Sequence, residues 1–65
     1  MTETERRKIT YAISLILHVK PRSVYIERVE MVSEKENKVF ATCNGVSYGA
    51  LMSGSLVLYT WRVLS

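Results

Sequence analysis

The first third of the chain has the hydrophobic periodicity of an amphipathic helix. Its apolar residues recur three and four positions apart and so would share one core-facing stripe. They are Ile9, Ala12, Ile13, Ile16 and Leu17, widened by Leu15 and Val19. Thr2 and Glu5 have the spacing of a capping box, and Pro21 blocks continuation. His18 and Lys20 would place cations in the last turn, where the helix dipole favours them. The pattern predicts a helix over residues 3–18.

Residues 24–31 alternate between apolar and polar side chains, as a half-buried strand does. The apolar phase slips by one position between Ile26 and Val29. A β-bulge near Glu27-Arg28 would restore a single buried face, because the extra residue shifts the alternation back into register. The segment is therefore predicted to be a strand with a bulge in its middle.

Turn residues divide the remaining sequence into further strand-like segments. A charged turn at residues 33–38 precedes an apolar run over residues 39–43. Asn44-Gly45 then favours a type I′ hairpin, because both residues tolerate a positive φ. Residues 46–52 would form the returning strand, and a Ser-Gly-Ser turn leads into a last strand over residues 56–64.

These elements predict an α+β fold, in which one N-terminal helix precedes a three- or four-stranded antiparallel meander sheet packed on the helix. The three-stranded alternative treats residues 48–54 as an irregular loop or a short helical turn. Gly49 weakens that strand, and it would mark either a bulge or a close approach to the backbone. The 65 residues are expected to form a single domain, residues 1–65.

The last predicted strand is apolar on both faces, although one helix can cover only one of them. One parity contains Leu56, Leu58 and Leu64, and the other contains Val57, Tyr59, Trp61 and Val63. If the leucines pack on the helix, the second set faces outward, and we take it as the predicted interaction surface. The strand would also end the sheet as an edge that another chain can pair with. The competing interpretation makes it the central strand, with residues 48–53 folded over the second face.

Chain length and cysteine usage also favour association. A 65-residue chain is marginally stable without a disulfide, a metal or a partner. One cysteine excludes an internal disulfide, and one cysteine with one histidine cannot complete a four-ligand zinc site. A homo-oligomer is therefore expected. The lone cysteine is typical of a reducing compartment, so a cytoplasmic or other intracellular location is expected.

Two apolar stretches resemble targeting or membrane segments at first sight. Basic residues precede the N-terminal apolar run, but Glu3 and Glu5 lie where a signal peptide is positive, and no small-residue cleavage site follows. Residues 46–64 have the length of a membrane span, yet they contain several serines and Arg62 and end in β-forming residues. Neither stretch is predicted to be a targeting signal or a membrane span.

No residue pattern supports catalysis or cofactor binding. Cys43 and His18 are the only conceivable nucleophile–base pair, and nothing in the sequence brings them together or supplies an aspartate to orient the histidine. The glutamates lie beside lysines and arginines, where solvation and cross-strand ion pairing explain them. The glycines precede strands, so they do not form a phosphate-binding loop before a helix. We assign no catalytic, cofactor-binding or metal-binding residue and expect a non-enzymatic protein.

A net charge of +3 permits contact with nucleic acid without requiring it. The candidate phosphate contacts are Arg6, Arg7, Lys8, Lys20 and Arg22. The first three occupy successive helix positions and spread around the axis, and the other two lie roughly 20 Å further along. Aromatic residues on the sheet could add base stacking, but only Arg62 is interleaved with them. A small basic nucleic-acid-binding module is therefore the second hypothesis.

The first hypothesis is a small non-enzymatic protein-interaction or assembly module that associates through an apolar, aromatic sheet face or through an edge strand. Accessory and structural proteins of phages and other mobile elements share this size and character, which is an analogy of class alone. The partner is expected to be another protein chain, in the simplest case a second copy.

Overall fold

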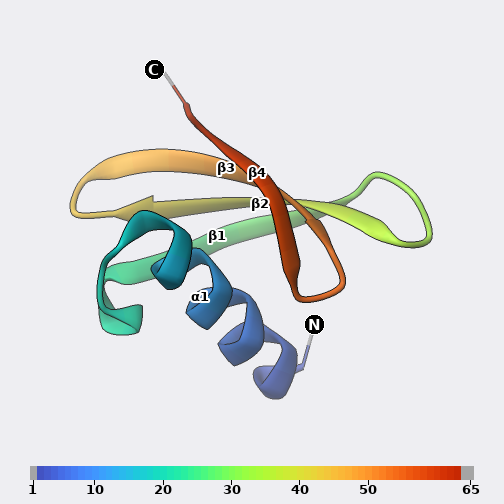
Figure 1. The fold of residues 1–65 in the computed structure, drawn as a ribbon, viewed down its shortest axis with the longest axis horizontal. Coiled ribbons are helices and arrows are strands. Elements are labelled where there is room, and N and C mark those ends of the chain that lie inside the picture. Colours follow the sequence, from blue (N-terminus) through green and yellow to red (C-terminus); the bar gives the residue numbers. More distant parts are fainter. Residues whose placement is uncertain (1, 64–65) are drawn as a thin grey trace.

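The computed structural model describes residues 2–63, in which one helix packs on a four-stranded antiparallel sheet (Figure 1). The elements in chain order are α1 (Glu3–Leu17), the 3-10 turn η1 (Pro21–Ser23), β1 (Val24–Met31), β2 (Glu36–Cys43), β3 (Val46–Ser53) and β4 (Leu56–Arg62). The strands lie in the order β1-β2-β3-β4, so the sheet is an open meander with β1 and β4 at its edges. The predicted α+β fold is confirmed in its four-stranded form, and the interpretation of β4 as a central strand is wrong.

Both hairpins in the second half of the chain have the backbone angles that two-residue turns require. Asn44 and Gly45 both have positive φ, 50° and 81°, as expected for type I′. In the next turn only Gly54 has a positive φ, 62°, which matches the type II′ pattern with glycine in the first position. The tight turns explain why residues 46–53 form a strand despite Gly49.

The predicted bulge in β1 is present. Ile26 lies opposite Ala41 and Arg28 lies opposite Phe40, which leaves Glu27 as the extra residue. The bulge keeps the apolar residues on both sides of Glu27 directed toward the helix. The shift in the apolar alternation between Ile26 and Val29 therefore predicted the position of this bulge correctly.

Helix α1 begins as the sequence predicts but ends differently. The Thr2 hydroxyl accepts a hydrogen bond from the Glu5 backbone N–H at 3.1 Å, which caps the first turn. The helix ends at Leu17, and His18 follows in the left-handed conformation with φ 57° and ψ 45°. The prediction that His18 and Lys20 lie in the last turn is wrong, because this left-handed residue stops the helix before both of them.

His18 occupies a position that glycine would fill with less strain. The N–H groups of His18 and Val19 donate to the carbonyls of Leu15 and Ser14, at 3.4 Å and 3.0 Å, as in a Schellman motif. A side chain with a Cβ costs about 1 kcal/mol in this conformation. We expect His18→Gly to raise the free energy of unfolding by about 0.5–1 kcal/mol in urea denaturation. His18→Ala keeps the Cβ and should give no such gain; equal stabilisation by both variants would contradict this explanation.

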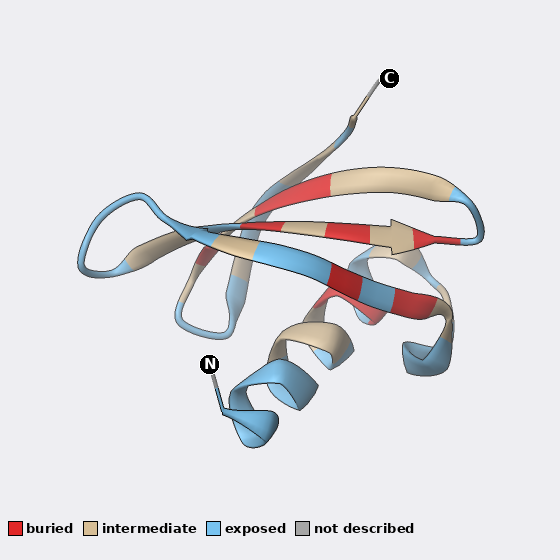
Figure 2. Ribbon diagram, turned by 180° about the vertical axis from the view of Figure 1, so that it is seen from behind, coloured by how far each residue is buried: buried red, intermediate tan, exposed pale blue. Residues whose placement is uncertain are grey.

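The core lies between the C-terminal half of α1 and the first three strands, where buried segments are concentrated (Figure 2). Its buried side chains are Ile13, Val24, Ile26, Val39, Ala41, Ala50 and Met52. Ser14 is also buried, with its hydroxyl donating to the Tyr11 carbonyl at 2.6 Å. The prediction that Ile16 faces the core is wrong, since Ile16 remains 47% exposed and Leu15 57% exposed. The other predicted positions are confirmed: Ile13 is buried, and Ile9, Ala12, Leu17 and Val19 pack against the core.

Candidate interaction surface

Strand β4 contains a second bulge, at Leu58, that decides which of its side chains face the helix. Met52 of β3 lies opposite Val57, whereas the preceding residue, Leu51, lies opposite Tyr59. Leu58 is therefore left without a residue opposite it. Figure 1 shows β4 crossing the other strands at a steep angle, in keeping with the extra twist that a bulge produces.

The bulge separates the four residues that the sequence predicts as one surface. Val57 packs against the buried core on the helix side of the sheet. Tyr59 and Trp61 lie on the outer face, which the helix does not cover. Val63 continues the parity of Trp61, and its N–H donates to the Ser47 carbonyl at 2.9 Å. The four residues do not share a face, because period-two counting cannot include the extra residue of a bulge.

The leucines of β4 do not pack on the helix. Leu56 is 65% exposed and Leu58 is 45% exposed, and Leu64 lies outside the described residues. Leu56 and Leu58, with Ser53 and the turn at residues 33–36, line an open groove of about 530 Å³. Apolar side chains thus remain accessible at both even-numbered and odd-numbered positions of β4.

Trp61 rests against the backbone of β3 at Gly49, the residue opposite it in the sheet. A Cβ built on Gly49 would overlap the indole carbons Cε2 and Cζ2 of Trp61. Of the two explanations for Gly49, a bulge or a close approach, the second is confirmed. The absence of a side chain on β3 is what lets the indole lie close to the sheet.

Trp61 is the centre of an aromatic cluster on the outer face. Its ring meets Phe40 edge to face, with centroids 6.3 Å apart, and Tyr59 at a tilt, with centroids 5.7 Å apart. The Arg28 guanidinium lies 4.1 Å from the centroid of the Phe40 ring and is held by Glu30, 2.7 Å from Nε to Oε2. We call Phe40, Tyr59 and Trp61 the aromatic patch.

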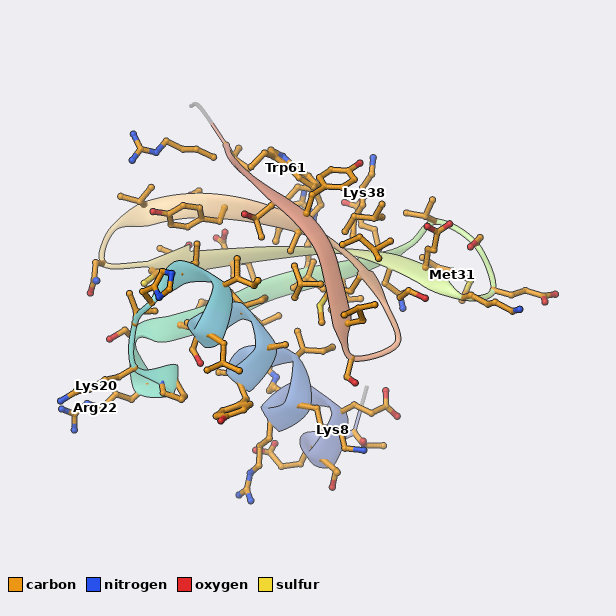
Figure 3. All side chains as sticks on the ribbon, viewed as in Figure 1. Lys8, Lys20, Arg22, Met31, Lys38 and Trp61 are labelled. Atoms are coloured by element: carbon orange, nitrogen blue, oxygen red, sulfur yellow. The ribbon has the colours of Figure 1, made fainter. Side chains whose placement is uncertain are left out.

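The aromatic patch is accessible and is bordered by charges of both signs. Tyr59 is 57% exposed, and the other two rings are half-buried. Lys38 lies opposite Glu30 in the sheet and on the same face as the patch (Figure 3). Ring-to-ring and cation–π contacts hold the rings in one arrangement, so a partner would meet a preformed surface.

The basic residues proposed as phosphate contacts do not form one patch. Lys8 lies in the N-terminal part of α1, while Lys20 and Arg22 flank Pro21 at the opposite end of the helix (Figure 3). Arg7 forms an exposed ion pair with Glu3, with Nε 3.7 Å from Oε1. Nucleic-acid binding by these residues stays a prediction, and the residues do not form a continuous charged surface that would support it.

The described residues offer no assembled reactive centre. Cys43 is 4% exposed within the sheet, whereas His18 is exposed at the end of the helix. Within residues 2–63 no hydrogen bond joins the two, and no group of three histidine, cysteine or acidic side chains is placed to hold a metal ion. In the same part of the chain, no helix has both the length and the apolar character needed to cross a bilayer.

Sequence reasoning missed two parts of this surface. Phe40 and Arg28 complete the cluster, but their contact depends on which residues of β1 and β2 lie opposite each other, and the predicted bulge does not by itself fix that pairing. Tyr11 and Leu15 form a separate exposed apolar pair on α1, each 57% exposed. The signal for Leu15 was present, because the predicted apolar stripe of the helix, which included Leu15, was wider than one sheet can cover; Tyr11 was not part of that stripe.

Comparison with known proteins gives no further guide, since no protein family, no curated protein and no solved structure matches the chain. The functional proposal therefore depends on the geometry and chemistry of the surface itself.

Proposed function

We propose that this chain is a non-enzymatic protein-interaction module whose contact surface is centred on the aromatic patch. The observation that supports the proposal most is the arrangement of Trp61, which rests on Gly49 between Phe40 and Tyr59 on the sheet face opposite the helix. An isolated antiparallel domain usually presents a polar outer face to water. Here the most hydrophobic aromatic side chains of the chain lie there instead.

The residue types of this face are those that dominate protein interfaces. Trp, Tyr and Arg are enriched among residues whose loss weakens binding most, because they combine a large apolar area with a polar group. The charges beside the patch include Arg28 and Lys38 but also Glu30 and Glu36. Since these charges balance, the face favours a protein surface over a polyanion such as RNA.

A second copy of the chain is the first partner to test. Small domains gain stability when a partner buries part of their apolar surface, and self-association provides that partner without a second protein wherever the concentration of the chain exceeds the dissociation constant. Symmetric dimers are also the commonest oligomers of soluble proteins.

Self-association through the patch predicts a large effect of Tyr59→Ser. The wild-type chain should sediment as a dimer in equilibrium with monomer, and Tyr59→Ser should raise the dissociation constant by at least about tenfold, the loss typical of an interface aromatic residue. Sedimentation equilibrium over a concentration series measures this change. Tyr25→Ser is the matched control, because Tyr25 is 65% exposed but lies on β1 at the other edge of the sheet.

Two outcomes would contradict the proposal. One is a wild-type chain that stays monomeric up to millimolar concentration, and the other is an equal effect of Tyr25→Ser and Tyr59→Ser. The nucleic-acid alternative is tested on the same samples by titration with DNA and RNA at two salt concentrations. Electrostatic binding must weaken steeply with salt, and an absence of binding at low salt would exclude it.

A further inference from the structure

We propose that β4 pairs edge to edge with β4 of a second copy, antiparallel and centred on Trp61, so that the two sheets become one. The inference rests on the proposed function and specifies its mode of contact. It follows from three observations: the free backbone groups of β4, the protected state of the opposite edge, and the registers that the sequence of β4 permits.

Strand β4 has backbone hydrogen-bonding groups that β3 does not use. The Val63 N–H donates to Ser47, so this pair is hydrogen-bonded, and antiparallel pairs alternate between bonded and non-bonded. Trp61 and Tyr59 therefore direct their N–H and C=O groups toward β3. Thr60 and Arg62 direct theirs away from it, toward the open edge. Such groups form a template for another strand.

The other edge of the sheet is protected against pairing. Strand β1 carries the bulge at Glu27, which disrupts a regular row of backbone groups. Glu27, Arg28 and Glu30 are all exposed on it, and charges on an edge strand oppose pairing. Strand β4 also has a bulge, at Leu58, but its register from Tyr59 to Arg62 is regular. It has one charge, Arg62, and no acidic residue. The chain therefore leaves a single edge suited to strand addition.

Symmetry restricts how two copies of β4 can pair. In an antiparallel pair related by a two-fold axis, residues whose backbone groups point to the open edge must lie opposite each other. Thr60 and Arg62 are such residues, and they allow three registers. A register with Thr60 opposite Thr60 brings Arg62 against the bulge at Leu58. A register with Arg62 opposite Arg62 places like charges directly across, which is unfavourable. The remaining register pairs Thr60 with Arg62 and uses the outward groups of both residues.

This register also joins the two aromatic patches. It places Trp61 opposite Trp61 of the second copy, on the outer face and beside the two-fold axis. The two Trp61 residues then form a non-hydrogen-bonded pair across the new junction. In this kind of pair the opposing side chains lie closest together. The Arg62 side chain lies opposite the uncharged Thr60 of the second copy. Arg62 carries the only charge on the strand, so the two arginines do not face each other. The self-complementary pattern identifies a second copy as the occupant of the edge.

The size of the junction sets its expected strength. A standard stable interface buries about 800 Å² on each partner, about a sixth of the 4712 Å² accessible surface of this chain. Pairing of one short strand buries less than that, at the low end of the range for specific complexes. We therefore expect a dimer with a dissociation constant in the micromolar range.

Thr60→Pro tests the edge directly. Proline removes the outward N–H of Thr60, which β3 does not use, and proline is tolerated on edge strands for this reason. We expect a folded monomer by circular dichroism and sedimentation, with no dimer at concentrations where the wild-type chain dimerises. A folded Thr60→Pro variant that dimerises like wild type would overturn the proposal.

A charge pair at Thr60 tests the register without proline. In the proposed register Thr60→Glu faces Arg62 of the second copy at two symmetric positions, whereas Thr60→Lys faces the same arginine with a like charge. We expect Thr60→Glu to lower the dissociation constant and Thr60→Lys to raise it, each by roughly threefold or more. The same two substitutions at Thr4, an exposed residue of α1, control for the change in net charge.

The outcomes separate this inference from the proposed function. If Tyr59→Ser weakens the dimer while Thr60→Pro, Thr60→Glu and Thr60→Lys leave it unchanged, the aromatic patch acts face to face and the edge pairing is wrong. If Thr60→Glu changes the dissociation constant no differently from Thr4→Glu, and Thr60→Lys no differently from Thr4→Lys, the register is wrong. A wild-type monomer at all concentrations overturns both proposals.

Discussion

Gly49→Ala is expected to lower the free energy of unfolding by about 1–3 kcal/mol, the usual cost of inserting a methyl group into a packed site. The new Cβ would overlap the indole of Trp61, so the ring must leave its place on the sheet and lose its contacts with Phe40 and Tyr59. Urea denaturation followed by circular dichroism measures the loss. Without this contact, alanine in a strand should be more favourable than glycine.

A double-mutant cycle isolates the contact between these two residues. In a Trp61→Ala background the steric overlap is absent, and Gly49→Ala should cost nothing or stabilise the chain by up to about 1 kcal/mol. The coupling between the two sites should therefore have the size of the single-mutant loss. Equal costs of Gly49→Ala with and without Trp61 would contradict the packing described for the outer face.

Ile13→Ala is expected to have the largest effect on stability, a loss of about 2–5 kcal/mol. Ile13 is 2% exposed and lies in the core between α1 and the sheet. A domain of this length has a total stability of about 3–10 kcal/mol, so the variant should lose a large part of its stability and unfold at a much lower temperature than the wild-type chain. Thermal denaturation followed by circular dichroism measures the effect.

Ile16→Ala provides the matched control, because it removes the same atoms from the next turn of the same helix. Ile16 is 47% exposed, so we expect a loss below about 1 kcal/mol. The sequence predicted both isoleucines on the core-facing stripe, and the comparison therefore tests the helix orientation. A loss at Ile16 equal to that at Ile13 would mean that α1 turns a different face to the sheet from the one that buries Ile13 and exposes Ile16.

The two bulges show what the hydrophobic pattern can and cannot reveal. In β1 the apolar phase changes between Ile26 and Val29, and a bulge at Glu27 is the simplest structure that buries both. In β4 the residues around Leu58 are apolar on both parities, so an extra residue leaves no trace in the pattern. The faces of β4 therefore depend on its pairing with β3, which the sequence does not display.

The helix stripe presents a similar ambiguity. Apolar residues from Ile9 to Val19 cover an arc wider than the contact with the sheet, and periodicity alone does not say which side of the arc is buried. The structure buries Ser14 beside Ile13 and leaves Leu15 exposed. A serine can occupy that place because its hydroxyl is satisfied by the Tyr11 carbonyl.

The candidate surface was predictable in part. Tyr59 and Trp61 were identifiable because one helix cannot cover both faces of an apolar strand. Gly49 was a second indication, since a glycine within a strand often marks a close approach to the backbone. The contributions of Phe40 and Arg28 required the register across all four strands, and no local pattern contains that information.

Trp61 is the only tryptophan of the chain, so its fluorescence reports directly on the aromatic patch. A dilution series from millimolar to sub-micromolar concentration tests whether this patch is the site of association. We predict that the emission maximum moves to longer wavelength on dilution, with a midpoint that matches the dissociation constant from sedimentation, because water reaches the half-buried indole when the dimer separates. An emission spectrum that stays the same across the whole series, with the chain monomeric throughout, would contradict the proposed interaction surface.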